Sequence, residues 1–443
     1  MDTPFVAFVP LSEWTRGFDR YAMRYSKELL PASRHPDCFF MMKVGENLAP
    51  ALEKVRSRIA RTAVHGDRVV ALRADLPERP GAMVRNTHTG TGVGWRWPKP
   101  WIPLASFGLA AEDGSFAPQR HETLTALAYQ LETNTLVAWA DCRPRTLSVL
   151  PIARACNAKC AFCFSKASLS EMSKQPPADE SLWSAWAKAA SLRGAERAVI
   201  TGGGEPGLLE PRSLERLTAA LAGALGKVLM ITNGSRLADL DDGELSRRLA
   251  SLVENGLTKL AISRHGIDER EDERIMGIRV CAARVARVSR ESAPRLGLRS
   301  ICVLQRGAVD SPERVKSYLR RMASEGFDEV CFKELYVSAI SENSWAPSPV
   351  NLYCEQQQVP LAMVVNTLAD LGFEVQERLP WGSPVFTGTV DGVLMKVAAY
   401  TEPSVGWERS RGTVRSWNLL ADGGCFASLE DPSSKLELAA QPG

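Results

Sequence analysis

The chain has 443 residues, of which 45% are hydrophobic and 24% charged, and its formal net charge is +3. This balance is that of an ordinary globular protein, and so small a net charge argues against nucleic acid or an anionic membrane surface as partners. We see no basic segment followed by an apolar one at the N-terminus and no apolar run long enough to cross a bilayer, so we expect a cytoplasmic protein with no membrane partner.

The length suggests two or three packed units. The first of these, residues 1–145, is expected to be an N-terminal α/β accessory domain. Its apolar runs predict strands at Phe5–Pro10, Cys38–Val44 and Arg68–Asp75, and helices at Leu11–Leu30 and Leu48–Ala60. A segment rich in Trp, Pro and Gly follows at residues 92–101. We interpret it as a loop that packs the domains together, with a substrate-facing wall as the alternative.

Residues 146–340 alternate apolar β-branched runs with amphipathic stretches, and the later strand starts lie about 30 to 40 residues apart, one βα unit each. Repeated βα units imply a parallel sheet, and six of them make a partial (β/α)6 TIM-like barrel of the α/β class. Reactive groups are then expected at the C-terminal ends of the strands. The predicted strands are Leu147–Ile152, Arg197–Ile200, Lys227–Ile231, Thr258–Ser263, Leu298–Leu304 and Asp328–Glu334, and the predicted helices include Ser181–Arg193, Asp241–Glu254, Arg279–Glu291 and Ser311–Glu325.

The remaining residues, 341–443, hold a β-like run at Val390–Thr401 and are expected to form a C-terminal region that caps the substrate.

Three clustered cysteines, Cys156, Cys160 and Cys163, form a C-x3-C-x2-C array directly after the first predicted barrel strand. Thiolates at this spacing are typical iron–sulfur ligands, and three of them leave a four-iron cube one ligand short. Structural zinc usually requires four protein ligands, and no nearby cysteine or histidine supplies the fourth. A zinc- or iron-binding structural or sensor protein without enzymatic activity is the competing hypothesis.

A second motif, residues 201–206 (Thr-Gly-Gly-Gly-Glu-Pro), follows the second predicted strand. Glycines allow a backbone to approach a ligand closely, and the Glu205 carboxylate offers an acceptor for an ammonium group. A tight βα connection is the simpler interpretation of such a turn when it stands alone.

Together the two motifs resemble those of the radical S-adenosylmethionine (radical SAM) superfamily, with Phe162 as the aromatic residue before the third cysteine. The resemblance implies a [4Fe–4S] cluster bound by the three cysteines, and S-adenosylmethionine (SAM) on the iron that they leave open. It implies further contacts to SAM, from the glycine turn to its amino group, from the Phe162 backbone to its adenine, and from three later strand ends. The residues concerned are Phe162, Gly203, Gly204, Glu205, Pro206, Asn233, Ser263, Arg264 and Arg299. For Arg299 a structural ion pair is the equal alternative.

The chemistry implied by this resemblance begins with one electron passing to the sulfonium of SAM. The products are methionine and a 5′-deoxyadenosyl radical, which removes hydrogen from the substrate. A flavodoxin- or ferredoxin-type protein is the expected reductant. No C-x2-C-like pair lies among the later cysteines, so we expect a single cluster.

Residues near the end of the sixth strand and in the C-terminal region are candidates for substrate contact or catalysis. Cys331 is a candidate hydrogen donor, with simple core packing as the alternative. The others have ion pairs or an exposed strand face as alternatives; they are Lys333, Glu334, Tyr336, Arg409 and Arg411.

We expect a small-metabolite substrate. One alternative is a ribosomal peptide that the enzyme epimerises or cross-links. Another is methylation by a cobalamin-dependent enzyme, although the N-terminal region lacks the D-x-H-x-x-G signature of cobalamin binding.

Overall fold

The computed structural model describes residues 137–174, 179–337, 348–359, 361–380, 383–403, 408–409 and 411–438, together with six short strands in the first 118 residues. These strands form antiparallel pairs: β1 (Met23–Arg24) with β4 (Trp101–Ile102), β2 (Val84–Arg85) with β3 (Gly92–Val93), and β5 (Gly108–Ala110) with β6 (Phe116–Pro118). β1 lies inside the helix that we predicted at residues 11–30. The prediction is wrong at these two residues, because their pairing with β4 requires extended backbone. The three strands and the second helix predicted for the N-terminal region lie outside the described residues.

The barrel region contains the six predicted strands, each within two residues of its predicted ends. They pair in chain order, and every pairing is parallel. This confirms the α/β class and the repeated βα units. The strands are β8 (Thr146–Leu150), β9 (Arg197–Ile200), β10 (Val228–Thr232), β11 (Leu257–Ser263), β12 (Gly297–Val303) and β13 (Glu329–Lys333).

The C-terminal region extends this sheet at both ends. β16 (Val393–Tyr400), within the predicted run 390–401, pairs in parallel with β13, and β18 (Trp417–Leu420) pairs in parallel with β8. Antiparallel strands complete the sheet, which runs from β14 to β20 without closing among the described residues. The expected domain boundary at 340 therefore falls within one sheet. The outer strands are β14 (Glu374–Arg378), β15 (Pro384–Val390), β19 (Cys425–Phe426) and β20 (Lys435–Leu436), while β7 (Arg143–Pro144) pairs separately with β17 (Thr413–Val414).

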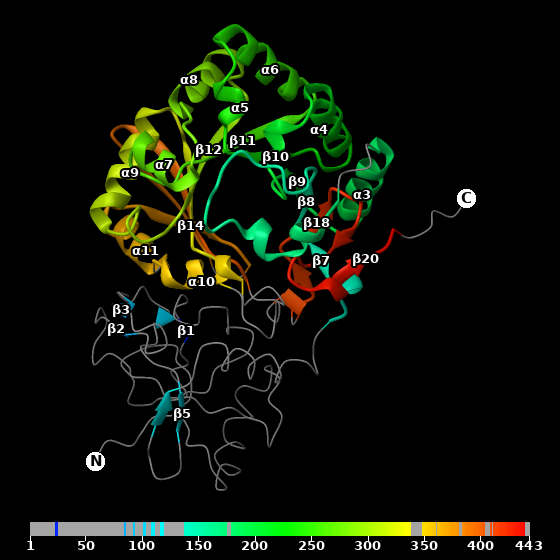
Figure 1. The fold of residues 1–443 in the computed structure, drawn as a ribbon. Helices are drawn as coiled ribbons and strands as arrows, with labels where there is room; N and C mark the ends of the chain where they lie inside the picture. Colours follow the sequence, from blue (N-terminus) through cyan, green and yellow to red (C-terminus); the bar gives the residue numbers. More distant parts are fainter. Residues whose placement is uncertain are drawn as a thin grey trace.

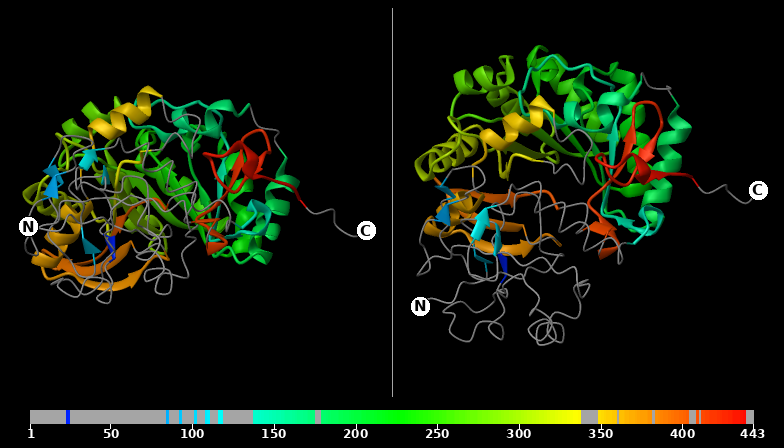
Figure 2. Two further views of the ribbon diagram at one scale, coloured as in Figure 1. Left: turned by 90° about the horizontal axis from the view of Figure 1, so that it is seen from below. Right: turned by 60° about the horizontal axis from the view of Figure 1, so that its bottom comes forward.

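Helices cover the convex outer face of the curved sheet (Figures 1 and 2). The four predicted helices are present, and three of them start at a side-chain cap; at Ser311, for example, the hydroxyl accepts a hydrogen bond from the Arg314 amide. The helices are α3 (Glu180–Leu192), α4 (Pro211–Leu225), α5 (Ser235–Ala238), α6 (Asp242–Glu254), α7 (Glu269–Met276), α8 (Ala282–Ser292), α9 (Pro312–Ser324), α10 (Pro349–Gln356) and α11 (Leu361–Asp370), with short 3-10 turns at 139–141, 164–167, 169–172, 206–208 and 432–434.

Alternate residues of each strand face opposite sides of the sheet. One set packs in the core beneath the helices, and the other set faces the side of the sheet where the cavity lies. In β11, Leu260 and Ile262 are fully buried in the main core between sheet and helices. Ala261 belongs instead to a small apolar cluster with Val199 and Leu229, and that cluster lies on the inner face of the sheet. The inner face is therefore the side on which a ligand cavity can form.

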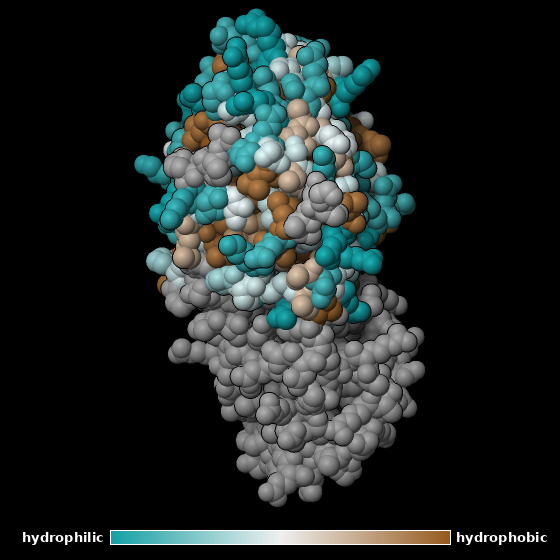
Figure 3. Space-filling model, turned by 90° about the vertical axis from the view of Figure 1, so that its right-hand side faces the viewer, coloured by the Kyte–Doolittle hydropathy of each residue, from teal (hydrophilic) through white to brown (hydrophobic). Residues whose placement is uncertain are grey.

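The outer surface on the side of α3 and α4 is largely hydrophilic, with apolar residues in small separate patches (Figure 3). None of the helices in the described part of the chain combines the length and hydrophobicity needed to span a bilayer.

Candidate active site

The cysteine loop follows β8 at the C-terminal edge of the parallel sheet, as predicted. Cys156 is exposed, and Cys160 and Cys163 are partly buried. Two backbone hydrogen bonds fix the loop: the Glu205 amide donates to the Ala155 carbonyl at 2.8 Å, and the Lys159 amide donates to the Met276 carbonyl at 2.7 Å. The loop is thus tied both to the glycine turn and to the end of α7.

Asn157, between the first two cysteines, adds a third attachment that we did not predict. Its Oδ1 accepts a hydrogen bond from the Asn233 side-chain amide, and its Nδ2 donates to the Ser235 hydroxyl, both at 2.8 Å. Asn233, predicted as a SAM contact, therefore holds the cysteine loop against the end of β10. The asparagine between the first two cysteines of the motif is the sequence signal from which this attachment could have been predicted.

The electrostatics of the loop couple the thiols to one another. Burial, together with the neighbouring Cys163 and Cys156, raises the pKa of Cys160 to about 12. Burial also raises the pKa of Cys156. Because a thiol with a raised pKa keeps its proton, cations at the site would favour the thiolate form that a metal cluster requires.

The donor set fits an iron–sulfur cluster better than a single ion. Among the described residues, no group of three Cys, His, Asp or Glu side chains is arranged to hold one metal ion. The zinc hypothesis requires such an arrangement, with sulfurs about 2.3 Å from a common centre. A four-iron cube instead places each thiolate on a different iron, so it suits three thiols that are near one another without converging on one point.

The glycine turn packs directly on the cysteine loop. A Cβ at Gly203 would lie 2.6 Å from the Ile152 carbonyl oxygen, and one at Gly204 would overlap the Ala155 carbonyl oxygen. An isolated parallel bridge also joins Ala153 to Gly203. In this structure the glycines serve the close approach of two loops, and the backbone of the turn lies beside the residue that precedes Cys156.

The Glu205 carboxylate is buried and accepts hydrogen bonds from the Thr232 hydroxyl, the Asn233 amide and the Gly207 amide, the last two at 2.8 Å. The carboxylate therefore joins the ends of β9 and β10, and its expected contact to an ammonium group stays a prediction. Pro206 starts the 3-10 turn that follows and is also buried.

Phe162 packs edge-on against His265, with ring centroids 5.0 Å apart. The Nδ1 of His265 accepts a hydrogen bond from the Val303 amide at 3.1 Å, and burial lowers its pKa to about 3, so the ring is neutral. His265 lies two residues beyond Ser263, the last residue of β11. Its side chain extends from the turn after β11 to Phe162 of the cysteine loop.

Arg264 does not face the site, which corrects our prediction. Its side chain is fully buried on the outer face and pairs with Asp272 at 3.0 Å, while its Nη1 donates to the Val280 carbonyl at 3.0 Å. The alternation of β11 is the reason, because Arg264 continues the outward series of Leu260 and Ile262. Ser263 continues the inward series and stays a predicted SAM contact.

Asp272 is the shared carboxylate of this buried network, since it also pairs with Arg321 at 2.8 Å. Replacing Asp272 with asparagine removes the nearer carboxylate of the buried Arg264 guanidinium and leaves Glu325 as the one remaining counter-ion of Arg264 and Arg321 among the described residues. We expect a loss of about 3–5 kcal/mol of unfolding free energy, measured as a lower denaturation midpoint in urea. The control is Asp239→Asn, which removes an exposed ion pair with Arg236 and should cost less than about 1 kcal/mol. Equal midpoints for the two variants would contradict this account.

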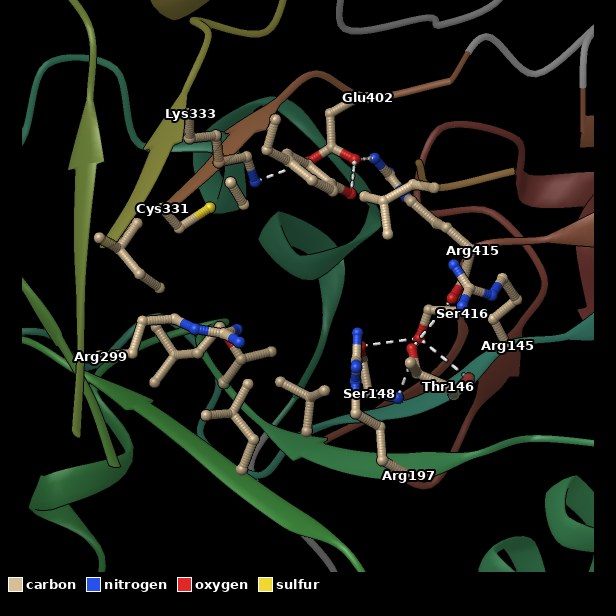
Figure 4. Close-up of a pocket in the computed structure, with 18 of the residues that line it drawn as sticks. Arg145, Thr146, Ser148, Arg197, Arg299, Cys331, Lys333, Glu402, Arg415 and Ser416 are labelled. Carbon is tan, nitrogen blue, oxygen red and sulfur yellow. Dashed lines mark hydrogen bonds and ion pairs between the residues drawn. The ribbon is translucent and has the colours of Figure 1, made fainter. Parts of the chain in front are cut away.

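A cavity of about 440 Å³ lies on the inner face of the sheet (Figure 4). Phe164 and Ser165, which follow Cys163 directly, line it, so the cavity borders the cysteine loop. Cys331 and Lys333 line it as predicted. Lys333 pairs with Glu402 at 2.6 Å, and burial together with the nearby Arg415 lowers the pKa of Lys333 to about 8.

Arg299 also lines the cavity, but near the start of β12, where its Nη2 pairs with Glu329 at 2.6 Å. The structure thus shows the ion pair that we gave as the alternative to a SAM contact.

Three other residues that we predicted to contact the substrate do not line this cavity. Glu334 points to the outer face, where its carboxylate accepts a hydrogen bond from the Leu361 amide at 3.4 Å, because it follows the inward-facing Lys333. Arg409 donates to the Val137 carbonyl and stacks on Trp139, and Arg411 is exposed; neither lines the cavity. The neighbouring Arg415 does.

Tyr336 does not line the cavity, but its ring packs edge-on against Phe164 with centroids 4.8 Å apart, which places it beside the cysteine loop.

Residues 150–332 match the family model described as the radical SAM superfamily. They carry both the cysteine loop and the glycine turn. These residues are thus a radical SAM domain, and the superfamily consists of enzymes that use a [4Fe–4S] cluster and SAM.

Solved structures with a similar fold include SuiB of Streptococcus suis bound to S-adenosylmethionine, with 19% identity, a TM-score of 0.35 and coverage of 57% of this chain and 51% of that one. Coproporphyrinogen III oxidase of Escherichia coli, a radical SAM enzyme, has 13% identity, a TM-score of 0.33 and coverage of 53% and 54%. Methylornithine synthase has 13% identity, a TM-score of 0.34 and coverage of 56% and 68%. The chain spans about half the length of the first two. No curated protein matches it.

Proposed function

We propose that Cys156, Cys160 and Cys163 hold the [4Fe–4S] cluster, and that the enzyme removes hydrogen from a small metabolite bound in the cavity on the inner face of the sheet. The observation that carries this proposal is continuity: the residues directly after Cys163 line the cavity. A volume of about 440 Å³ lies in the usual range for small-molecule sites. When bound, the cluster supplies the electron that splits SAM reductively.

The chain's own residues would orient SAM between cluster and cavity. Backbone carbonyls of the glycine turn would accept the hydrogen bonds of its ammonium group, and Ser263 would contact its ribose or carboxylate. Phe162 and the neutral His265 would give the adenine an apolar edge. Apolar side chains of the inner face, including Val199, Leu229 and Ile301, would keep water away from the reacting carbon.

For the epimerase alternative, we propose that Cys331 returns a hydrogen atom to the substrate. Its thiol lines the cavity, and burial raises its pKa, so that it keeps its proton. Transfer of the S–H hydrogen atom to a carbon radical would leave a thiyl radical. The external reductant would then supply one electron, and solvent one proton, to restore the thiol.

We further propose a flavodoxin- or ferredoxin-type reductant, a cytoplasmic location and a supporting role for residues 1–145. The exposed position of Cys156 supports electron entry from an external protein.

Anaerobic reconstitution with iron and sulfide, followed by dithionite and SAM, tests the proposed function. We expect about four irons per chain and the formation of 5′-deoxyadenosine and methionine. A chain that binds the iron but forms neither product would contradict the proposal.

A further inference from the structure

The end of the cavity away from the cysteine loop is lined by arginines. Arg145 lies just before β8, Arg197 begins β9, and Arg299 lies near the start of β12. Their side chains extend toward the cavity from different sides (Figure 4). Because the strands are parallel, their starts meet at one edge of the sheet, opposite to the edge that carries the cysteine loop.

The lining as a whole carries more positive than negative charge. Its cations are Arg145, Arg197, Arg299, Lys333, Lys396 and Arg415, and its carboxylates are Glu329, Glu377 and Glu402.

Each of these carboxylates already has a cationic partner. Glu329 pairs with Arg299 and Lys259, Glu402 pairs with Lys333 and Arg415, and Glu377 pairs with Lys396. Arg145 is also paired, with Glu196 outside the lining, at 3.2 Å. The surplus of positive charge therefore rests on the lining cation that has no carboxylate partner among the described residues.

Arg197 carries this surplus most directly. Its side chain makes no hydrogen bond or ion pair with any residue in the described part of the chain, and its Nε is buried without a partner. Burial and the nearby Arg299 and Arg145 cations lower its pKa, which reports a positive potential around its guanidinium. A buried guanidinium donor without a partner is costly, and an anionic ligand would remove that cost.

We propose that Arg197, with Arg299 and Arg145 beside it, binds an oxyanion group of the substrate, either a carboxylate or a phosphate. A guanidinium presents paired donors that match both groups. Thr146 of β8 is the register partner of Arg197 in the sheet. Ser148 and Ser416 also line the cavity and add hydroxyl groups to its wall.

This inference rests on the proposed function and sharpens its substrate class to an anionic small metabolite. From Arg197 to Ile200, the last residue of β9 before the glycine turn, the strand rises about 10 Å. A small molecule held at Arg197 by its anionic end would therefore extend along the strands toward the SAM site. The same separation distinguishes this anion site from a contact to the SAM carboxylate.

Isothermal titration of the reconstituted protein, saturated with SAM, tests the site with inorganic phosphate and with succinate as probes. We expect at least one probe to bind, and its preference tells a phosphorylated substrate from a carboxylated one. Arg197→Gln should weaken binding at least about tenfold, the loss expected for a charge-assisted contact. Arg197→Lys, which keeps the charge but loses the fork, should give an intermediate affinity. Arg247→Gln, at an exposed position of α6, is the matched control and should bind as wild type does.

Failure of both probes to bind, wild-type affinity in both Arg197 variants, or competition between probe and SAM would overturn the inference. Probe binding is read separately from SAM cleavage. If the wild-type protein cleaves SAM but binds neither probe, the anion site alone is rejected. If it binds a probe but does not cleave SAM, the proposed function is rejected.

Discussion

Replacing Cys156 with alanine is expected to remove both the iron–sulfur cluster and the cleavage of SAM. Two thiolates cannot hold a cube that already lacks a fourth protein ligand, and Cys156 is exposed at the start of the loop, where no other residue of the motif can replace it. The brown colour and visible absorbance of the reconstituted protein should be lost, and 5′-deoxyadenosine formation should fall at least about 1,000-fold, the scale of losing an essential metal group.

The matched control is Cys281→Ala, because Cys281 is also an exposed thiol but lies outside the motif, before α8, where its side chain makes no capping hydrogen bond. We expect this variant to keep its iron content and its rate of SAM cleavage. Retained cleavage in Cys156→Ala, or equal loss in both variants, would contradict the assignment of the ligands.

Replacing Gly204 with alanine is expected to displace the cysteine loop. The new methyl group would overlap the Ala155 carbonyl oxygen and approach the Ile152 side chain to 2.9 Å. That carbonyl also accepts the Glu205 amide at 2.8 Å, so relief of the overlap breaks the bond between turn and loop. Because a misplacement of about 1 Å can cost 100-fold in rate, we expect SAM cleavage to fall by at least about that factor.

Gly223→Ala separates this effect from a general sensitivity to alanine. Gly223 lies inside α4, and nothing stands within 4 Å of a Cβ placed there. Alanine should stabilise the helix by about 1 kcal/mol and leave SAM cleavage unchanged. Wild-type cleavage in Gly204→Ala would show that the turn does not position the loop.

The strands of the barrel region could be predicted because each is a short β-branched run followed by an amphipathic helix. β18 could not, since its partner β8 lies some 270 residues earlier in the chain and no local pattern reveals so distant a pairing. The same limit applies to β16, which was predicted as a β-like run but not as a neighbour of β13. Long-range pairing is decided by the packing of the whole sheet.

Most wrong predictions at the site concern the direction in which a side chain points. Some of these directions could have been predicted from the sequence. Arg264 follows the outward residues Leu260 and Ile262, and Glu334 follows the fully buried Phe332, so the two-residue alternation of a strand already placed both outside the cavity. The hydrogen bonds of Glu205 with Thr232 and Asn233 could not be predicted from the sequence, because they depend on how closely the turns after β9 and β10 approach each other.

The most direct test of the central claim is electron paramagnetic resonance of the dithionite-reduced protein, recorded with and without SAM. The account requires a [4Fe–4S] cluster on Cys156, Cys160 and Cys163 with one iron open to SAM. It therefore predicts a reduced-cluster signal whose g-values shift when SAM is added. A reduced-cluster signal that is identical with and without saturating SAM would contradict the claim.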